Sequence, residues 1–537
     1  MKRKLASTRP RGHRGPAAEV MHVKQETHFH LSDPRDGLTS RRGGVILRRF
    51  NSQQPVGLCL QRLIILYLCV SWHIGVAQSM RMQPSASVEG PSQTYLSATP
   101  SSDATSASSL DRQYALGSWG GIRSKLGRRG IVPTALLISD PFGSVHGGEQ
   151  TGASAYNLFG VDIRVDTTPL LGWKGGQFDV GGAVNWGTSL SRSYIGNGFQ
   201  VQLADCAGSQ PRLTYLSFTQ SLLGDRISAR IGRLTLNSVF GEEFMGSEYF
   251  KSFTSIGFDL VPEGLFFDAS GAAGYPRTSW GTRIRYSSGR RLYAQAGAYN
   301  ADSDQLNGSH HGIDFSLRGP LFAIGEVGYR HFTDDDSARP SSNIKGGGFY
   351  TGGTQHAASN GVLKPVHGLY GFYVLGDQQL WRFKVPSGSP KAISEISRWG
   401  DAEHERHVGV VASAVVVPEP RTNIMPYFFN VGIVSYGPSP QRPRDSFGVG
   451  LVYGSYSRGP IPSGPQSNNG QIPFQVPSNE QTLEVNYGFA VRPGVVFQPT
   501  LEYILHPKGI SSIPSRLSAG SAVPNALAVG VNTVINF

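Results

Sequence analysis

The last twelve residues of the chain, 526–537, alternate between apolar side chains and small or polar ones. A period of two is that of a β-strand with one apolar face. Because an unpaired strand leaves its N–H and C=O groups without partners, we expect this one to be completed inside a closed β-barrel. The apolar parity holds Leu527, Val529, Val531, Ile535 and Phe537, with Thr533 as its polar member, and the other parity holds Ala528, Gly530, Asn532 and Asn536.

The same alternation returns along the chain from about residue 155. One parity is apolar, with Tyr, Trp or Phe near the strand ends, and the other carries Arg, Asp and Glu beside Gly, as in transmembrane barrels. At about 10 residues per strand plus turns, residues 150–537 accommodate about 16 strands. We therefore expect an all-β fold, a transmembrane antiparallel β-barrel. The clearest segments are 177–187, 226–232, 282–287, 313–318, 447–456 and 480–492.

Composition agrees with many short strands. The 537 residues include 68 Gly and 34 Pro, aromatic residues reach 10%, and charged residues only 16%. These values suit strands joined by turns better than a helical enzyme. The slightly negative mean hydropathy is compatible with a membrane barrel, because such a barrel averages lipid-facing and lumen-facing residues.

The basic charge of the chain is concentrated near its beginning. The net charge is +12, but residues 1–78 hold 13 Lys/Arg against 4 Asp/Glu, so little excess remains for the rest. We expect no nucleic-acid partner on this ground. Residues 1–61 are predicted to be a disordered basic leader, 62–77 a secretory signal peptide and 78–113 a flexible linker. The alternative is a genuine extension before a membrane anchor.

Residues 114–135 are predicted to contain one short amphipathic helix on the periplasmic side. Leu116, Trp119, Ile122 and Leu126 recur at helical spacing, with basic residues between them. We expect this helix to pack on the end of the barrel. We also expect the last strand to close the barrel against the segment 157–166, with Phe537 at the periplasmic rim.

The sequence contains no motif of a metal or cofactor site. It has three cysteines, two of them in or beside the apolar leader, and no Cys/His spacing of a zinc site. It also lacks a nucleophile elbow, a phosphate loop and a dinucleotide fingerprint. We therefore expect no cofactor, no metal and no catalytic residue.

Several blocks of the sequence are similar, in order and spacing, to those of the OprB-type carbohydrate-selective porins. This resemblance runs from about Trp119 to Phe537. It implies a 16-stranded barrel in the bacterial outer membrane that lets sugars diffuse passively through a constriction of charged and aromatic side chains. It also implies that Phe537 is an outer-membrane insertion signal. The blocks include GTSLSRSYIGNGFQVQ (187–202), ISARIGRL (227–234), GYPRTSWGTRIRY (274–286), LYGFYVLGDQQLWR (369–382) and NALAVGVNTVINF (525–537).

A sugar offers hydroxyl groups at its rim and C–H groups on its faces. Weak binding therefore needs Arg and carboxylate partners together with an aromatic plane, and passage requires easy release. The alternative interpretation is an ordinary solvated lumen wall with structural ion pairs. The predicted constriction residues are Arg230, Arg233, Arg283, Arg285, Glu326 and Arg330, with Trp280 as a stacking platform.

The expected partners are mono- and small oligosaccharides, outer-membrane lipid and the barrel assembly machinery, with the protein acting as a monomer or a homo-oligomer. Two alternatives stay open at this point. One is a barrel with hydrolytic activity that uses Glu326 and Asp314 as an acid/base pair. The other is an adhesin or structural barrel with an occluded lumen.

Overall fold

The computed structural model describes most of the chain after residue 113. These residues belong to one compact unit, Val88–Phe537. The expected leader 1–61, signal peptide 62–77 and linker 78–113 lie outside the described residues, as does Asp314. The described residues are 114–205, 211–236, 244, 247–258, 273–301, 311–313, 315–332, 341–359, 362–383, 406–418, 425–456, 479–507 and 522–537.

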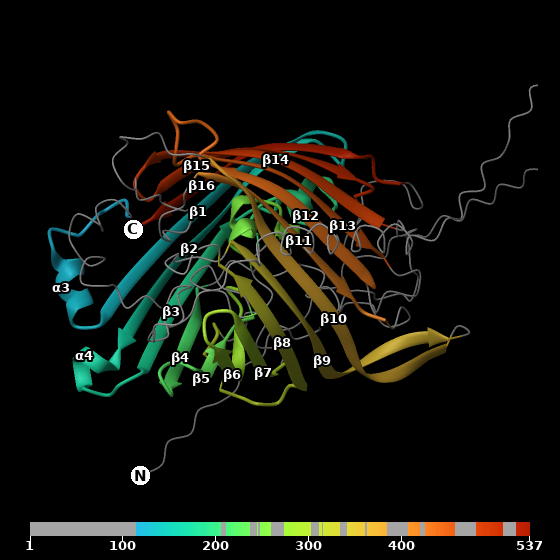
Figure 1. Ribbon diagram of the computed structural model, residues 1–537. Helices are drawn as coiled ribbons and strands as arrows, with labels where there is room; N and C mark the ends of the chain where they lie inside the picture. The colour runs from blue at the N-terminus through green and yellow to red at the C-terminus, as the bar shows by residue number, and fades with distance from the viewer. Residues whose placement is uncertain are drawn as a thin grey trace, which may run out of the picture. The chain divides into compact units, whose positions relative to one another are not determined.

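Sixteen strands among the described residues form a closed antiparallel barrel, in which each strand pairs with its neighbours in sequence (Figure 1). This confirms the expected fold. No helix in the described part of the chain is both long and apolar enough to cross a membrane. The strands are β1 (Ile131–His146), β2 (Gly152–Asp166), β3 (Gly176–Gly187), β4 (Arg212–Leu222), β5 (Ile227–Leu234), β6 (Ser279–Ser288), β7 (Leu292–Asn300), β8 (Leu321–His331), β9 (Ser342–Ser359), β10 (Val362–Arg382), β11 (His407–Val416), β12 (Tyr427–Tyr436), β13 (Ser446–Ser455), β14 (Asn479–Arg492), β15 (Val495–Leu505) and β16 (Ala526–Asn536).

The barrel closes where β16 pairs with β1. We expected the segment 157–166 to be the closing partner, and this was wrong, because that segment lies in β2, which pairs with β1 and β3. The expected start of the barrel at residue 150 is also too late, since β1 begins at Ile131. β1 is hard to recognise because apolar residues occupy both of its parities, as in the run ALLI at 135–138.

A short helix, α3 (Ile122–Arg128), precedes β1. It ends before the expected limit of residue 135 because Gly130 turns the chain into the first strand. Gly130 has a φ of 80°, and a Cβ atom there would lie 2.6 Å from the carbonyl oxygen of Asp166. The expected apolar stripe does not hold the helix in place, because Ile122 is 56% exposed whereas Arg123 is buried.

Arg123 fastens α3 to the seam between the first and last strands. Its guanidinium donates hydrogen bonds to the carbonyl oxygen of Pro133 at 3.3 Å and to the terminal residue Phe537. The same group lies over the rings of Tyr114 and Trp119, 3.9 and 4.2 Å from their centroids. The N-terminal helix is therefore anchored at the point where β16 ends.

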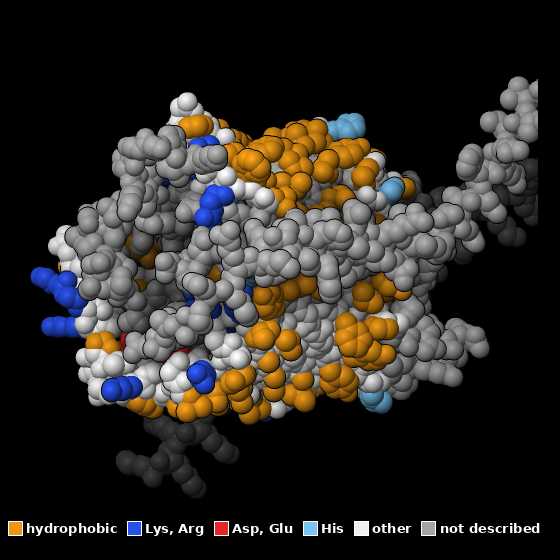
Figure 2. All heavy atoms as spheres, in the orientation of Figure 1, with side chains coloured by type: hydrophobic (Ala, Val, Ile, Leu, Met, Phe, Trp, Pro, Cys, Tyr) orange, Lys and Arg blue, Asp and Glu red, His pale blue; other side chains and the backbone are white. Residues whose placement is uncertain are grey.

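The apolar parity of the strands forms the outer face of the barrel (Figure 2). Ile231, Ile284 and Val529 are 62%, 57% and 43% exposed. One expected strand is missing, because the described residues of 313–318 lie outside any strand. Strands β7 and β8 on either side of this segment already pair with each other, so its alternation has no place in the sheet.

Two connections fold back into the barrel, and we call them the inward segments: 188–205, between β3 and β4, and 247–258, between β5 and β6. The first contains the π-helical turn η1 (Ser191–Ile195). The second contains the 3-10 turns η2 (Glu248–Ser252) and η3 (Ile256–Phe258). The alternation of the strands gives no sign of these segments, so sequence reasoning missed them.

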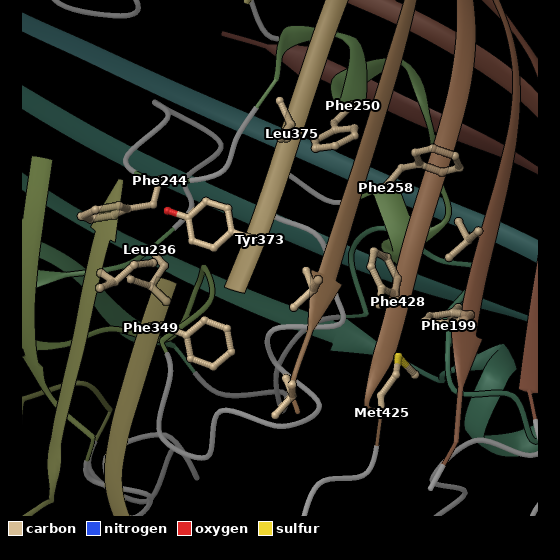
Figure 3. Close-up of a cluster of buried hydrophobic side chains, with 14 of the residues drawn as sticks. Phe199, Leu236, Phe244, Phe250, Phe258, Phe349, Tyr373, Leu375, Met425 and Phe428 are labelled. Carbon is tan, nitrogen blue, oxygen red and sulfur yellow. The ribbon is translucent and has the colours of Figure 1, made fainter. Parts of the chain in front are cut away.

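A hydrophobic core lies inside the barrel, between the inward segments and the wall (Figure 3). Phe250 and Phe258 belong to it together with inward-facing wall residues such as Phe428. Gly450 permits this packing, because a Cβ atom there would lie 2.5 Å from the ring of Phe258. The inner face is therefore partly apolar, contrary to the simple picture of a polar lumen.

Candidate functional site

Four arginines lie on the inward parity of three strands, and we call them the basic row: Arg230 on β5, Arg283 and Arg285 on β6, and Arg330 on β8. They share this parity with buried residues such as Ser228. Arg230 and Arg283 are direct cross-strand partners. The structure thus brings four of the predicted site residues to one region of the lumen wall.

An acidic residue supports one end of the basic row. Asp179 on β3 lies 3.2 Å from Arg230 and 3.3 Å from Arg164 on β2, measured from guanidinium nitrogen to carboxylate oxygen. Arg230 also donates to the hydroxyl of Ser217 at 3.1 Å. Sequence reasoning missed Arg164 and Asp179, although both belong to the polar parity of alternating segments and could have been included on that signal.

Glu326 on β8 accepts hydrogen bonds from three side chains of the inner wall. It is 2% exposed, and its carboxylate accepts hydrogen bonds from Tyr293 at 2.9 Å, Gln295 at 2.9 Å and Tyr373 at 3.1 Å. The guanidinium groups of Arg285 and Arg330 lie 4.0 and 4.8 Å from the centroid of the Tyr293 ring. Glu326 therefore holds the Tyr293 ring in place, and Arg285 and Arg330 pack over that ring.

Arg233 and Trp280 lie on the other strand parity from the basic row, although the Arg233 side chain is only 1% exposed. They face each other across β5 and β6, and Arg233 also lies opposite Leu216, which is on the outward parity of β4. The Arg233 guanidinium donates to the hydroxyl of Thr278 at 3.1 Å. The ring of Trp280 lies 5.3 Å from that of Phe315. Arg233 is three positions from Arg230, and Trp280 is three positions from Arg283. Because strand side chains alternate with a period of two, the sequence alone assigns each pair to opposite parities.

The opposite wall, β14–β16 with β1, holds the inward segments through carboxylates. Glu480 accepts from the backbone N–H groups of Gly198 and Phe199 at 2.8–2.9 Å. Glu484 accepts from those of Thr254 and Ser255 at 2.9 and 2.8 Å. Both carboxylates are fully buried, so these charges are solvated by the protein backbone.

The inward segment 247–258 also contacts the wall at β10 and β12. Ser247 donates to Asp377 on β10 at 2.9 Å, and the hydroxyls of Ser252 and Tyr436 lie 2.7 Å apart. Across the described ranges, no group of three or more His, Cys, Asp or Glu side chains could hold a metal ion.

Residues 150–537 match the model of the family described as "Carbohydrate-selective porin, OprB family". The chain belongs to the OprB family. Porin B of Pseudomonas aeruginosa is 24% identical over 461 residues, covering 78% of this chain and 92% of that protein. The putative porin QuiX of Acinetobacter baylyi is 22% identical over 446 residues, covering 77% and 92%.

Among solved structures, the high-pH structure of Pseudomonas putida OprB is similar with a TM-score of 0.64 and 20% sequence identity. The match covers 80% of this chain and 100% of that one, and it agrees with the closed barrel described above. This OprB-family protein is a carbohydrate-selective porin of the bacterial outer membrane. Its family is one of channels rather than of enzymes.

Proposed function

We propose that sugars cross this porin between the basic row and the inward segments, without any chemical step. The observation that carries the proposal is the position of Arg230, Arg283, Arg285 and Arg330 on the inward parity of neighbouring strands. Guanidinium groups donate several hydrogen bonds in a fixed plane, which suits sugar hydroxyls. Because each contact is weak, the solute is released as readily as it is bound.

The other predicted constriction residues take different roles in this proposal. Glu326 positions Tyr293 and, through it, Arg285 and Arg330. Arg233 and Trp280 belong to the wall. We assign no hydrolytic role to Glu326, because its oxygens accept from three neutral side chains, whereas glycoside hydrolysis uses a pair of carboxyl groups flanking the sugar bond.

Substitution in the basic row tests this path. We expect Arg230→Ala and Arg283→Ala to change the rate of glucose-driven liposome swelling severalfold, because each removes a donor from the path. Both variants should keep the heat-modifiable gel migration of a folded barrel. Arg128→Ala, at an exposed position on α3, is the matched control, and liposomes that contain it should swell like those with the wild type. Unaltered flux after substitution of Arg230, Arg283, Arg285 and Arg330 in turn would remove the assignment.

We further propose that the apolar outer face contacts outer-membrane lipid and that Phe537 is read by the barrel assembly machinery. Deletion of Phe537 should lower the protease-protected fraction in the outer membrane, because the signal and the bond from Arg123 are both lost. Conductance per inserted channel should stay unchanged. Phe537→Tyr, which retains an aromatic end, is the control. Normal insertion of the deletion variant would contradict this role.

A further inference from the structure

The end of the barrel next to α3 carries exposed apolar side chains on two neighbouring turns. The first turn joins β2 to β3 and contains the short helix α4 (Thr167–Leu171), and the second joins β4 to β5. The turns are linked, because the Gln220 amide donates to the carbonyl oxygen of Lys174 at 3.0 Å. The exposed apolar side chains, which we call the rim patch, are those of Leu170, Leu171, Trp173, Leu222 and Leu223.

The rim patch continues the apolar outer face of the strands. The ring of Trp173 lies 5.1 Å from that of Phe218, which in turn lies 4.7 Å from that of Phe178 on the exposed parity of β3. Tryptophan is enriched where a membrane meets water, because its ring is apolar and its N–H is polar. The position of Trp173 at the end of this apolar surface therefore fits the level of the lipid headgroups.

The turn between β4 and β5 presents a leucine in an unfavourable backbone conformation. Leu223 has a φ of 54° and is 72% exposed. A bulky residue in the left-handed region is an outlier, and such strain concentrates at functional sites. Glycine would adopt this conformation at lower cost. An apolar partner outside the chain, such as an acyl chain, accounts for a leucine at this position.

Basic side chains lie beside the hydrophobic ones at this end of the barrel, around α3 and α4 (Figure 2). Lys174 follows Trp173 in the first turn, Arg226 ends the second, and both are exposed. The residues 122–130, 166–175 and 223–226 hold six Lys and Arg against two acids, Asp166 and Asp225. Of these acids, Asp166 caps α4 by accepting from Thr168 N at 2.8 Å. An apolar surface with positive surroundings is complementary to an anionic headgroup on acyl chains.

This end of the barrel is the one with the short connections. The turn 223–226 lies here, whereas the long connections 188–211 and 235–278 lie at the other end. Short turns face the periplasm in bacterial outer-membrane barrels. The leaflet on that side consists of phospholipids, some of which carry a net negative charge.

We propose, resting on the proposed contact of the outer face with lipid, that the rim patch binds an anionic phospholipid of the periplasmic leaflet. Lys174 and Arg226 donate to the headgroup phosphate, and the acyl chains pack beside Trp173 and Leu223. A phospholipid with a net negative charge is preferred over a zwitterionic one, because a cationic headgroup amine offsets the attraction to basic side chains.

The test places the full chain in vesicles that contain a minority of phosphatidylglycerol in phosphatidylcholine. Bromine, which quenches indole emission on contact, is carried by the acyl chains of either the phosphatidylglycerol or an equal amount of the phosphatidylcholine. The difference in emission between each protein and its Trp173→Phe counterpart isolates this one ring. We expect brominated phosphatidylglycerol to quench it about threefold more strongly, and the ratio to approach one in about 1 M salt, where the screening length is about 3 Å.

Matched variants tie the preference to the rim patch. Lys174→Gln combined with Arg226→Gln should bring the quenching ratio to about one, whereas Lys174→Arg combined with Arg226→Lys keeps both charges and should retain it. Heat-modifiable gel migration verifies that each variant is a folded barrel. Arg492→Gln is the control and should leave the ratio unchanged, because it removes an exposed cation at the end of β14, on the same rim but outside the patch.

Equal quenching by the two lipids would overturn the anionic preference and leave the contact with lipid intact. Quenching of Trp173 by neither lipid would overturn the lipid contact at this rim as well, and is the result expected if a second copy of the chain or another protein covers the patch. A ratio that survives Lys174→Gln combined with Arg226→Gln would also overturn the inference, because the anionic lipid would then be selected elsewhere.

Discussion

Two walls of the same lumen, β14–β16 and β5–β8, carry their charges in opposite ways. On the first wall, Glu480 and Glu484 are fully buried and accept backbone N–H groups from the inward segments. On the second, the basic row lies on strands that contain one acid, Glu326, whose carboxylate accepts hydrogen bonds from Tyr293, Gln295 and Tyr373. The first wall uses its carboxylates to hold the inward segments, and the second carries the four arginines that we propose line the sugar path.

The difference shows why a polar lumen parity does not by itself identify a binding site. A carboxylate beside a loop can be solvated by backbone N–H groups, with no cation needed. A guanidinium cannot be solvated by N–H donors, because it has no acceptor. Arginines on a wall therefore need carboxylates, carbonyl groups, water or a solute, and only the last two exchange during transport.

The largest effect is expected from breaking the anchored wall at Glu484. In Glu484→Ala, Thr254 N and Ser255 N lose their carboxylate acceptor, whereas the hydroxyl of Thr254 keeps Glu502 as an acceptor at 3.3 Å. Each buried donor left without a partner costs about 1–3 kcal/mol. We expect the segment 247–258 to detach and single-channel conductance to rise.

The control for this change is Glu484→Gln, which keeps one acceptor oxygen and should retain most of the closed conductance. Limited proteolysis of the inserted barrel should cut within 247–258 in the Ala variant only. Wild-type conductance and protease resistance in Glu484→Ala would show that the apolar packing of Phe250 and Phe258 holds the segment without the carboxylate.

The strands could be predicted from sequence because period-two alternation records which face meets lipid. The same rule places Arg230, Arg283, Arg285 and Arg330 on the inward parity, and it separates them from Arg233, which is three positions from Arg230. It failed for β1, whose apolar residues occupy both parities because its inner face packs on a core. It also failed for 313–318, where alternation exists without a strand.

The inward segments and their anchors could not be predicted because their partners are distant in sequence. The bond from Phe199 N to Glu480 joins residues 281 positions apart, and that from Thr254 N to Glu484 joins residues 230 apart. No local pattern distinguishes a strand glutamate that will accept such a bond from one that will face water. Only closure of the barrel brings them together.

A smaller effect is expected at Asp205, an acid of the inward segments that pairs with a cation. Asp205 ends the segment 188–205 and pairs with Arg192. Burial raises the pKa of the Asp205 carboxyl from its ordinary value of 3.8 to about 6, and the charge of Arg192 offsets this only in part. The folded protein therefore binds this proton more tightly than the unfolded chain does, and proton uptake stabilises the folded state.

Protonation of Asp205 therefore stabilises the segment 188–205 at low pH. The stabilisation is fully present below about pH 4 and is lost as the pH rises through about 6. Hydrogen exchange of this segment should therefore be slower at pH 4.5 than at pH 7.5, after correction for the intrinsic pH dependence of exchange. Asp205→Asn, which cannot titrate, should abolish the difference. Faster corrected exchange at the lower pH would mean that the ion pair with Arg192 outweighs the cost of burying the charge.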